Sequence, residues 1–155
     1  MSPVSSSVLD AGLEIVLVSP SVSEALPLQR ILARAQSTVT WFPTCRAALA
    51  FLREHPAGVV VSQTEMTDGC WKDLLDALSR FTPPPNLIVS SRLAEDRLWA
   101  EVLNLGGYDV LLTPFEREEA LRVCQAAGRA WQRKRSEISI PLSEAQSAAV
   151  ACAAG

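Results

Sequence analysis

The sequence predicts an α/β fold in which five short strands alternate with five helical segments. Three observations support this class: the strand candidates are runs of consecutive apolar residues, the segments between them repeat apolar residues at steps of three and four, and proline or glycine marks most boundaries. Continuous apolar strands are typical of parallel sheets that are covered on both faces. With right-handed crossovers between neighbouring strands, we expect a three-layer αβα sandwich.

The five expected strands are short and rich in β-branched residues. They comprise residues 14–18, 38–42, 58–62, 86–90 and 108–112. Three consecutive prolines at 83–85 enforce an extended entry to the fourth strand.

The first three helical segments each place apolar residues on one face. These residues are Leu28, Ile31, Leu32 and Ala35, then Ala48, Phe51 and Leu52, then Trp71, Leu74, Leu75 and Leu78. Because Pro27 is tolerated only in a first turn, the first helix is expected to begin near Leu26.

The fourth helix is expected over about residues 94–105 and the fifth over about 116–131. The apolar face of the fourth is assigned to Leu98, Val102, Leu103 and Leu105, and that of the fifth to a narrow stripe of Ala120, Cys124 and Ala127. Trp71 and Trp131 are expected to be packing residues.

Length and composition predict one cytoplasmic domain. The 155 residues, 48% of them apolar, suffice for one core, assigned here to residues 13–133, with tails at 1–12 and 134–155. The net charge of −3 comes without a basic stripe, so nucleic acid is not expected as a partner. The longest apolar runs are far shorter than the ~20 residues of a membrane span.

Cysteine and histidine usage argues against a metal site, a cofactor or a disulfide framework. Cys45, Cys70, Cys124 and Cys152 are far apart in the sequence, and His55 is the single histidine. A transition-metal site has almost no ligands from which to form.

Two segments near the third and fifth strands carry a family resemblance. Residues 66–69 read Met-Thr-Asp-Gly and are followed by Trp-Lys-Asp-Leu-Leu at 71–75, while 105–109 read Leu-Gly-Gly-Tyr-Asp and lead to Leu-Thr-Pro-Phe at 112–115. Together with the order of the elements, they make residues 14–133 resemble the receiver domain of two-component response regulators. The resemblance implies the flavodoxin-like strand order 2-1-3-4-5.

The resemblance also implies a phosphorylation site, but its residues have changed. Receiver domains accept a phosphoryl group from a histidine kinase on an aspartate of the third strand, with Mg²⁺ held by an acidic pair after the first. The acidic pair falls here on Ser19 and Pro20, the aspartate on Gln63 and the family's lysine on Thr113. The family also has a residue with a side-chain hydroxyl at this site, and only this position keeps its chemistry here, as Ser91. These five residues are called the vestigial site below.

The changed residues predict that phosphoryl transfer is lost. A serine hydroxyl and a proline ring do not replace the carboxylates that Mg²⁺ prefers. A glutamine amide lacks the nucleophilicity of a carboxylate, and Thr113 supplies no cation to stabilise a transferring phosphoryl group. We therefore expect no enzymatic activity, no metal and no cofactor.

Nearby residues leave an alternative open. Glu65 and Asp68 follow the third strand and could reach the vestigial site, although Asp68 also suits the turn before Gly69. A shift of one residue would place Ser62 or Thr64 at the acceptor position. Neither change restores the acidic pair.

The family's aromatic switch residue on the fifth strand is replaced by Val110, with Tyr108 two residues earlier. Because valine is small and stiff at χ1, a phosphate-driven rotamer switch is not expected.

Binding of a protein partner is therefore the predicted function. In receivers, the surface of the fourth helix, fifth strand and fifth helix commonly meets a partner or a second copy. Here it would carry Arg97, Trp99, Glu101, Asn104, Arg117 and Leu121. The tryptophan is the expected anchor if it is exposed, and ordinary core cover if it is not.

Three interpretations remain open at this point. The first is a phosphorylation-independent receiver that dimerises or docks onto a histidine kinase or another regulator, and the second is a phosphorelay receiver with a non-standard acceptor. The third is a small-molecule sensor or enzyme of flavodoxin-like or dinucleotide-binding type. The last lacks a glycine-rich phosphate-binding turn, because residues 19–21 read Ser-Pro-Ser.

Overall fold

The computed structural model describes residues 13–93 and 95–138 and contains one parallel five-stranded sheet. The strands are β1 (Glu14–Val18), β2 (Thr38–Phe42), β3 (Val59–Gln63), β6 (Asn86–Ser91) and β7 (Asp109–Leu112). Their spatial order is β2-β1-β3-β6-β7, which is 2-1-3-4-5 when these five strands are counted along the chain. The predicted fold class is confirmed.

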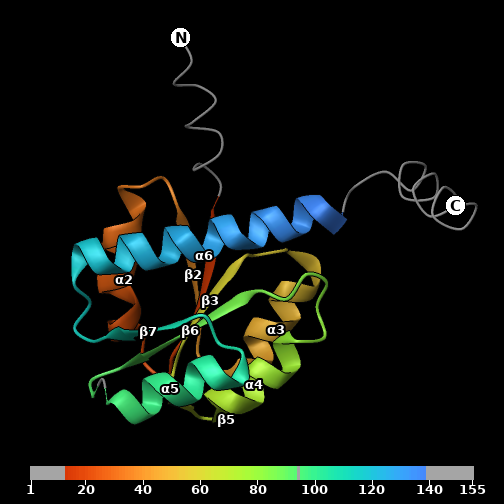
Figure 1. Cartoon of the computed structure of the whole chain (residues 1–155). Helices are drawn as coiled ribbons and strands as arrows, with labels where there is room; N and C mark the ends of the chain where they lie inside the picture. The colour runs from red at the N-terminus through yellow and green to blue at the C-terminus, as the bar shows by residue number, and fades with distance from the viewer. Residues whose placement is uncertain (1–12, 94, 139–155) are drawn as a thin grey trace, which may run out of the picture.

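Helices cover both faces of this sheet (Figure 1). They are the 3₁₀ helix η1 (Val22–Glu24) and the α-helices α2 (Ala25–Ala33), α3 (Cys45–Glu54), α4 (Trp71–Leu78), α5 (Asp96–Leu105) and α6 (Arg117–Ile138). Residues of α2 and α6 share one core with the sheet, and residues of α3, α4 and α5 share the other. The molecule is thus the expected three-layer sandwich.

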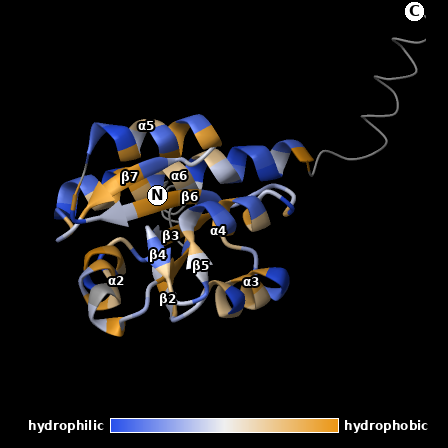
Figure 2. Ribbon diagram, turned by 90° about the horizontal axis from the view of Figure 1, so that it is seen from below, coloured by the Kyte–Doolittle hydropathy of each residue, from blue (hydrophilic) through white to orange (hydrophobic). Residues whose placement is uncertain are grey.

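The alternation of side chains along β1 shows how the sheet serves both cores. Val16 and Val18 pack toward α3 and α4, whereas Ile15 and Leu17 pack toward α2 and α6. All four are buried, because strands in the middle of a parallel sheet have no solvent face. Figure 2 shows the same pattern as apolar strands between helices of mixed polarity.

Several boundaries differ from the predicted ones. The first helix begins at Ala25, after η1, which Ser21 caps by accepting a hydrogen bond from the backbone N–H of Ser23. A short antiparallel pair that the sequence did not predict, β4 (Glu65–Met66) and β5 (Gly69–Cys70), follows β3. The two strands flank the Met-Thr-Asp-Gly segment at residues 66–69, which carries part of the family resemblance.

The last helix continues to Ile138, so the domain boundary expected at residue 133 falls inside it. Basic side chains are favourable near a helix carboxyl terminus. One of them, Arg135, lies 5.1 Å from the ring of Trp131, which is buried as expected. Of the expected tails, residues 1–12 and 139–155 lie outside the described residues.

The prediction for α5 is partly wrong. Val102 is buried and Leu98 partly so, but Leu103 and Leu105 are 40% and 53% exposed. Leu103 lies about 100° around the helix from Val102 and therefore turns away from the sheet. Leu105 ends the helix, because Gly106 adopts a left-handed conformation with φ of 106° and the chain turns away.

The stripe of Ala120, Cys124 and Ala127 on α6 is buried, as predicted. None of the helices in the described part of the chain has the length and apolar character needed to cross a bilayer.

Candidate functional site

The positions of the vestigial site lie together where the parallel strands end, at the carboxyl edge of the sheet. Gln63 ends β3 and is in register with Ser90, and Ser91 ends β6. Thr113 follows β7, and its backbone N–H donates to the carbonyl of Ser91 at 2.9 Å. Ser19 follows β1 directly. The fold therefore brings these positions to the edge where α/β sheets bind ligands.

Ser19 is committed to the local turn. Its buried hydroxyl donates to the carbonyl of Ser21 at 2.9 Å and accepts from the backbone N–H of Ser21 at 3.2 Å. Its carbonyl accepts a hydrogen bond of 3.0 Å from the indole N–H of Trp41. Pro20 is exposed. The positions at which the resemblance expects an acidic pair thus belong to a self-contained Ser-Pro-Ser turn.

These residues do not fit the Mg²⁺ that receiver chemistry uses. The positions from which Mg²⁺ would take carboxylate oxygens are Ser19, Pro20 and Gln63, and none of them is acidic. Within residues 13–93 and 95–138, no three His, Cys, Asp or Glu side chains lie together as metal ligands.

Asp68, a possible substitute acid, is used elsewhere. Its two carboxylate oxygens accept hydrogen bonds from the backbone N–H groups of Cys45 at 2.9 Å and Arg46 at 3.0 Å, at the start of α3. Desolvation raises the pKa of Asp68, but the hydrogen bonds from Arg46 and Cys45 outweigh it and hold the pKa below its usual value. Asp68 therefore caps α3, where its charge is favourable.

Of the other alternative acceptors, Ser62 is bonded locally. Its hydroxyl is buried and donates to the carbonyl of Gln63 at 3.1 Å. At Thr64, the backbone carbonyl accepts from the N–H of Trp71 at 3.0 Å. Glu65 lies exposed in β4.

Ser91 and Thr113 have different surroundings. The hydroxyl of Ser91 donates to the carbonyl of Leu93 and accepts from its N–H, both at 3.1 Å. Thr113 lines a solvent-open hollow of about 450 Å³. The other residues that line this hollow are Ser23, Pro27, Arg92, Pro114 and Phe115. The peptide bond between Thr113 and Pro114 is cis.

The switch position on β7 is part of the core. Val110 is buried among the residues that pack against α3, α4 and α5, and Tyr108 is partly buried against the other core.

Comparison with solved structures identifies the fold, although no protein-family model and no curated protein matches the sequence. The signal receiver domain of an HD domain-containing protein from Pseudomonas fluorescens Pf-5 is 22% identical, with a TM-score of 0.72, covering 82% of this chain and 93% of that one. The chemotaxis response regulator CheY4 of Vibrio cholerae is 18% identical, with a TM-score of 0.68, and the match covers 76% of this chain and 99% of that one. The beryllofluoride-activated NtrC4 receiver domain dimer in solution is 22% identical, with a TM-score of 0.70, and the match covers 76% of this chain and 98% of that one.

This chain has the fold of a receiver domain. Its α5, β7 and α6 correspond to the fourth helix, fifth strand and fifth helix of the receiver fold, which the sequence singled out as a partner surface. Four of the residues named for that surface are exposed: Arg97, Trp99, Asn104 and Arg117. Leu121 is instead partly buried against the core that α2 and α6 share.

Trp99 is exposed but held in place. Its side chain is 51% exposed, and its indole N–H donates to the carboxylate of Asp109 at 3.0 Å. The same oxygen accepts from the backbone N–H of Val110 at 2.8 Å. This arrangement joins α5 to β7 and presents part of the aromatic ring to solvent.

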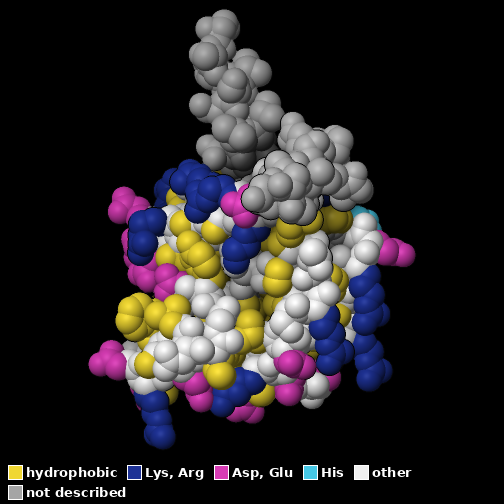
Figure 3. Space-filling view, turned by 45° about the vertical axis from the view of Figure 1, so that its right-hand side comes forward, with side chains coloured by type: hydrophobic (Ala, Val, Ile, Leu, Met, Phe, Trp, Pro, Cys, Tyr) yellow, Lys and Arg dark blue, Asp and Glu magenta, His cyan; other side chains and the backbone are white. Residues whose placement is uncertain are grey.

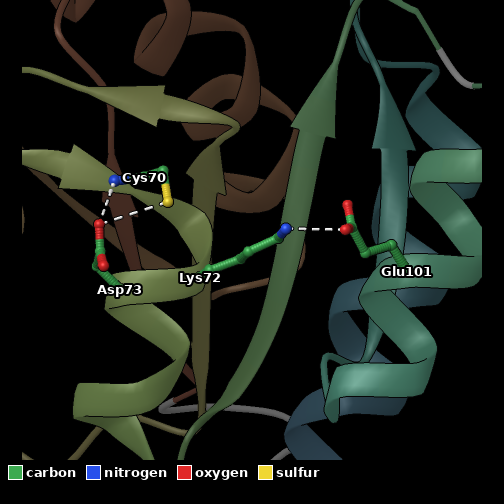
Figure 4. A network of polar contacts seen from close by, with 4 residues as sticks. All are labelled: Cys70, Lys72, Asp73 and Glu101. Carbon is green, nitrogen blue, oxygen red and sulfur yellow. Dashed lines mark hydrogen bonds and ion pairs between the residues drawn. The ribbon is translucent and has the colours of Figure 1, made fainter.

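Glu101 is engaged within the molecule. Its carboxylate lies 2.8 Å from the ammonium group of Lys72 at the start of α4, and this ion pair spans the space between α4 and α5 (Figure 4). The hydrogen bond from Lys72 and the charge of Glu101 raise the pKa of the lysine. Beside it, Asp73 accepts hydrogen bonds from the backbone N–H and thiol of Cys70, and these lower the pKa of Asp73.

The sequence missed the apolar part of this surface. Leu103 and Leu105 on α5 and Leu112 at the end of β7 are 40%, 53% and 45% exposed. Gly106, which ends α5 directly after Leu105, was the available signal for the exposure of Leu105. Trp99 and Leu103 lie one turn apart on one side of α5, whereas Leu105 is about 200° around the helix from Leu103. We call Trp99, Leu103 and Leu112 the α5–β7 patch.

Proposed function

We propose that this chain is a receiver-fold signalling module that takes up no phosphoryl group and acts by binding protein partners. The observation that carries the proposal is the chemistry of the carboxyl edge. Four of its five vestigial positions have lost the family's reactive side chain, and the hydroxyl of Ser19 is closed onto Ser21. A site without an acceptor carboxylate or ligands for Mg²⁺ has no means of phosphoryl transfer.

The α5–β7 patch is the surface through which we propose that the module binds. A tryptophan and two leucines lie exposed on one helix and the adjoining edge strand, and exposed aromatic anchors of this kind are enriched at interfaces. Arg97 and Asn104 on the same helix supply polar groups for a rim. On the face drawn in Figure 3, hydrophobic side chains also gather between acidic and basic ones.

A second copy of the chain is the partner that we propose first. The NtrC4 receiver domain, which shares this fold, forms a dimer in solution. A patch that buries a tryptophan and leucines against themselves about a two-fold axis also satisfies the self-complementarity that a symmetric dimer requires.

Intact-mass spectrometry after incubation with acetyl phosphate and Mg²⁺ tests the loss of phosphoryl transfer. We expect no mass gain, while a receiver domain that keeps its acceptor aspartate gains one phosphoryl group under the same conditions. A stable gain that maps to Glu65, Asp68 or another residue of the carboxyl edge would refute the proposal and favour a non-standard acceptor.

Size-exclusion chromatography with light scattering tests the surface. We expect a concentration-dependent dimer for the wild type and a monomer for Trp99→Ala. Leu26→Ala is the matched control, because Leu26 is 45% exposed but lies on α2. A dimer that survives Trp99→Ala would exclude this patch, and a wild-type monomer would exclude the homodimer and leave a different protein as the partner.

A further inference from the structure

We propose that the hollow beside Thr113 binds a small organic monoanion, with a carboxylate as its charged group and an aromatic or aliphatic body. The hollow lies at the carboxyl edge, where η1 contributes Ser23 and the first turn of α2 contributes Pro27. The β6–α5 connection contributes Arg92, and the β7–α6 connection contributes Thr113, Pro114 and Phe115. The inference goes beyond the proposed function, since it assigns a ligand to an edge that protein binding leaves without a role.

The size and lining of the hollow suit such a ligand. Its volume of about 450 Å³ falls within the range of ~300–1,000 Å³ that is common for small-molecule sites. Pro27, Pro114 and Phe115 offer an apolar wall, and the hydroxyls of Ser23 and Thr113 add polar groups that can orient a ligand. Such a mixture of apolar walls and few polar groups is typical of sites for small organic molecules.

The charge of the lining selects an anion with one negative charge. Arg92 is the only charged residue among the described residues that line the hollow. A guanidinium group binds a carboxylate through two parallel hydrogen bonds, and its five donors allow it to keep its present interaction with the protein at the same time.

The nearest acidic residue of the β7–α6 connection does not oppose an anion in the hollow. Glu116 follows Phe115, but its carboxylate accepts a hydrogen bond of 2.6 Å from the backbone N–H of Glu119 at the start of α6. Its charge is therefore partly compensated by the helix N-terminus.

The loss of phosphoryl chemistry explains why space exists here. The resemblance assigns to position 113 a lysine, whose long side chain would extend over this edge. Threonine is several atoms shorter, so the volume beside Phe115 stays open. The substitution that removes the family's cation thus leaves a cavity with Arg92 at its rim.

Three probes separate the contributions of charge and apolar body. Phenylacetate has both, 2-phenylethanol keeps the ring without the charge, and acetate keeps the charge without the ring. Each is titrated into the ¹⁵N-labelled full chain without Mg²⁺ or phosphodonor, and amide chemical shifts are followed. We expect phenylacetate to shift the amides of Arg92, Thr113 and Phe115 saturably, with a Kd on the order of 1 mM.

Arg92→Gln and Arg53→Gln form the matched pair of variants. Both replace an exposed arginine, but Arg53 lies on α3, outside the hollow and outside the α5–β7 patch. We expect Arg92→Gln to weaken the binding of phenylacetate about tenfold and Arg53→Gln to leave it unchanged. Both reference probes should bind at least about tenfold more weakly than phenylacetate in the wild type.

Three results would overturn the inference: no saturable shift around the hollow, equal binding by the wild type and Arg92→Gln, or 2-phenylethanol binding as tightly as phenylacetate. None of these bears on phosphorylation or dimerisation, so this proposal and the proposed function fail separately.

Discussion

The two helices that flank β7 use their apolar residues in opposite ways. On α6, the buried residues are Ala120, Val123, Cys124, Ala127, Gly128 and Trp131, which extend along most of the helix. On α5, Val102 is buried, whereas Trp99, Leu103 and Leu105 face solvent. Helix α6 therefore contributes mainly to the core, and α5 contributes mainly surface.

This difference assigns stability mainly to one of the two helices beside β7 and binding mainly to the other. Residues buried on α6 should affect the free energy of unfolding, whereas those exposed on α5 should affect association with little effect on folding. The contacts that hold helix α5 include Val102 and Leu98 in the core, the hydrogen bond from Trp99 to Asp109 and the ion pair from Glu101 to Lys72. Such an element can present a surface without weakening the domain.

The largest expected effect on stability comes from Trp131→Ala on α6. The indole is 5% exposed, donates to the carbonyl of Pro83 at 3.2 Å and packs against Gly58. Truncation leaves a cavity and an unpaired carbonyl, so we expect a loss of ~3–5 kcal/mol in urea denaturation. A loss below ~1 kcal/mol would show that α6 is not the anchor described here.

The second test compares thiol reactivity on the two helices. Burial raises the pKa of Cys124 on α6 to about 12, so its thiol is protonated and shielded at neutral pH. In a Cys152→Ser background, iodoacetamide should modify a cysteine placed on α5 by Leu103→Cys at least ~100-fold faster than Cys124. Peptide mapping over time measures both rates, and equal rates would contradict the comparison.

Trp99→Ala should change stability by less than ~1 kcal/mol, although it removes as large a side chain as Trp131→Ala does. Half of the ring is already in water, and the lost hydrogen bond to Asp109 is replaced by one to solvent. Denaturation at a concentration where the chain is monomeric measures this effect. A loss as large as that of Trp131→Ala would mean that Trp99 belongs to the core.

The smallest effect is expected from Glu101→Gln, which removes the ion pair with Lys72. The side chains of Lys72 and Glu101 are 49% and 43% exposed, so water and salt screen their attraction. We expect no measurable change in the denaturation midpoint at physiological salt, and a slight one at low salt. A clear loss at high salt would show that the ion pair fixes α5 more firmly than its exposure suggests.

The sequence predicted the sheet well because burial on both faces leaves a strong local signal. The runs in β1 and β2 matched the structure to the residue, and the apolar stripe of α6 was assigned correctly. The resemblance also placed the positions of the vestigial site at one edge, since strand ends in a parallel sheet converge whatever their side chains are. The buried Trp71 and Trp131 followed from the same patterns.

The surface was predicted less well, because exposure depends on neighbours that are distant in sequence. The spacing of apolar residues predicts a buried face on both α5 and α6, but only the packing of α5 against the sheet decides that Leu103 and Leu105 are exposed to water. Likewise, the sequence alone left Asp68 as a possible acid for the vestigial site. The tertiary structure pairs it with the start of α3, more than twenty residues away.

By itself, the sequence determined the α/β architecture and the order of its elements, because periodicity and residue identity are local properties. It also determined which residues stand where the resemblance expects an acidic pair, an acceptor and a lysine, namely Ser19, Pro20, Gln63 and Thr113. The tertiary structure decided which apolar residues form the α5–β7 patch, which acids are already bonded and where the hollow beside Thr113 opens. These features arise from contacts between segments far apart in the chain, so no local pattern could specify them.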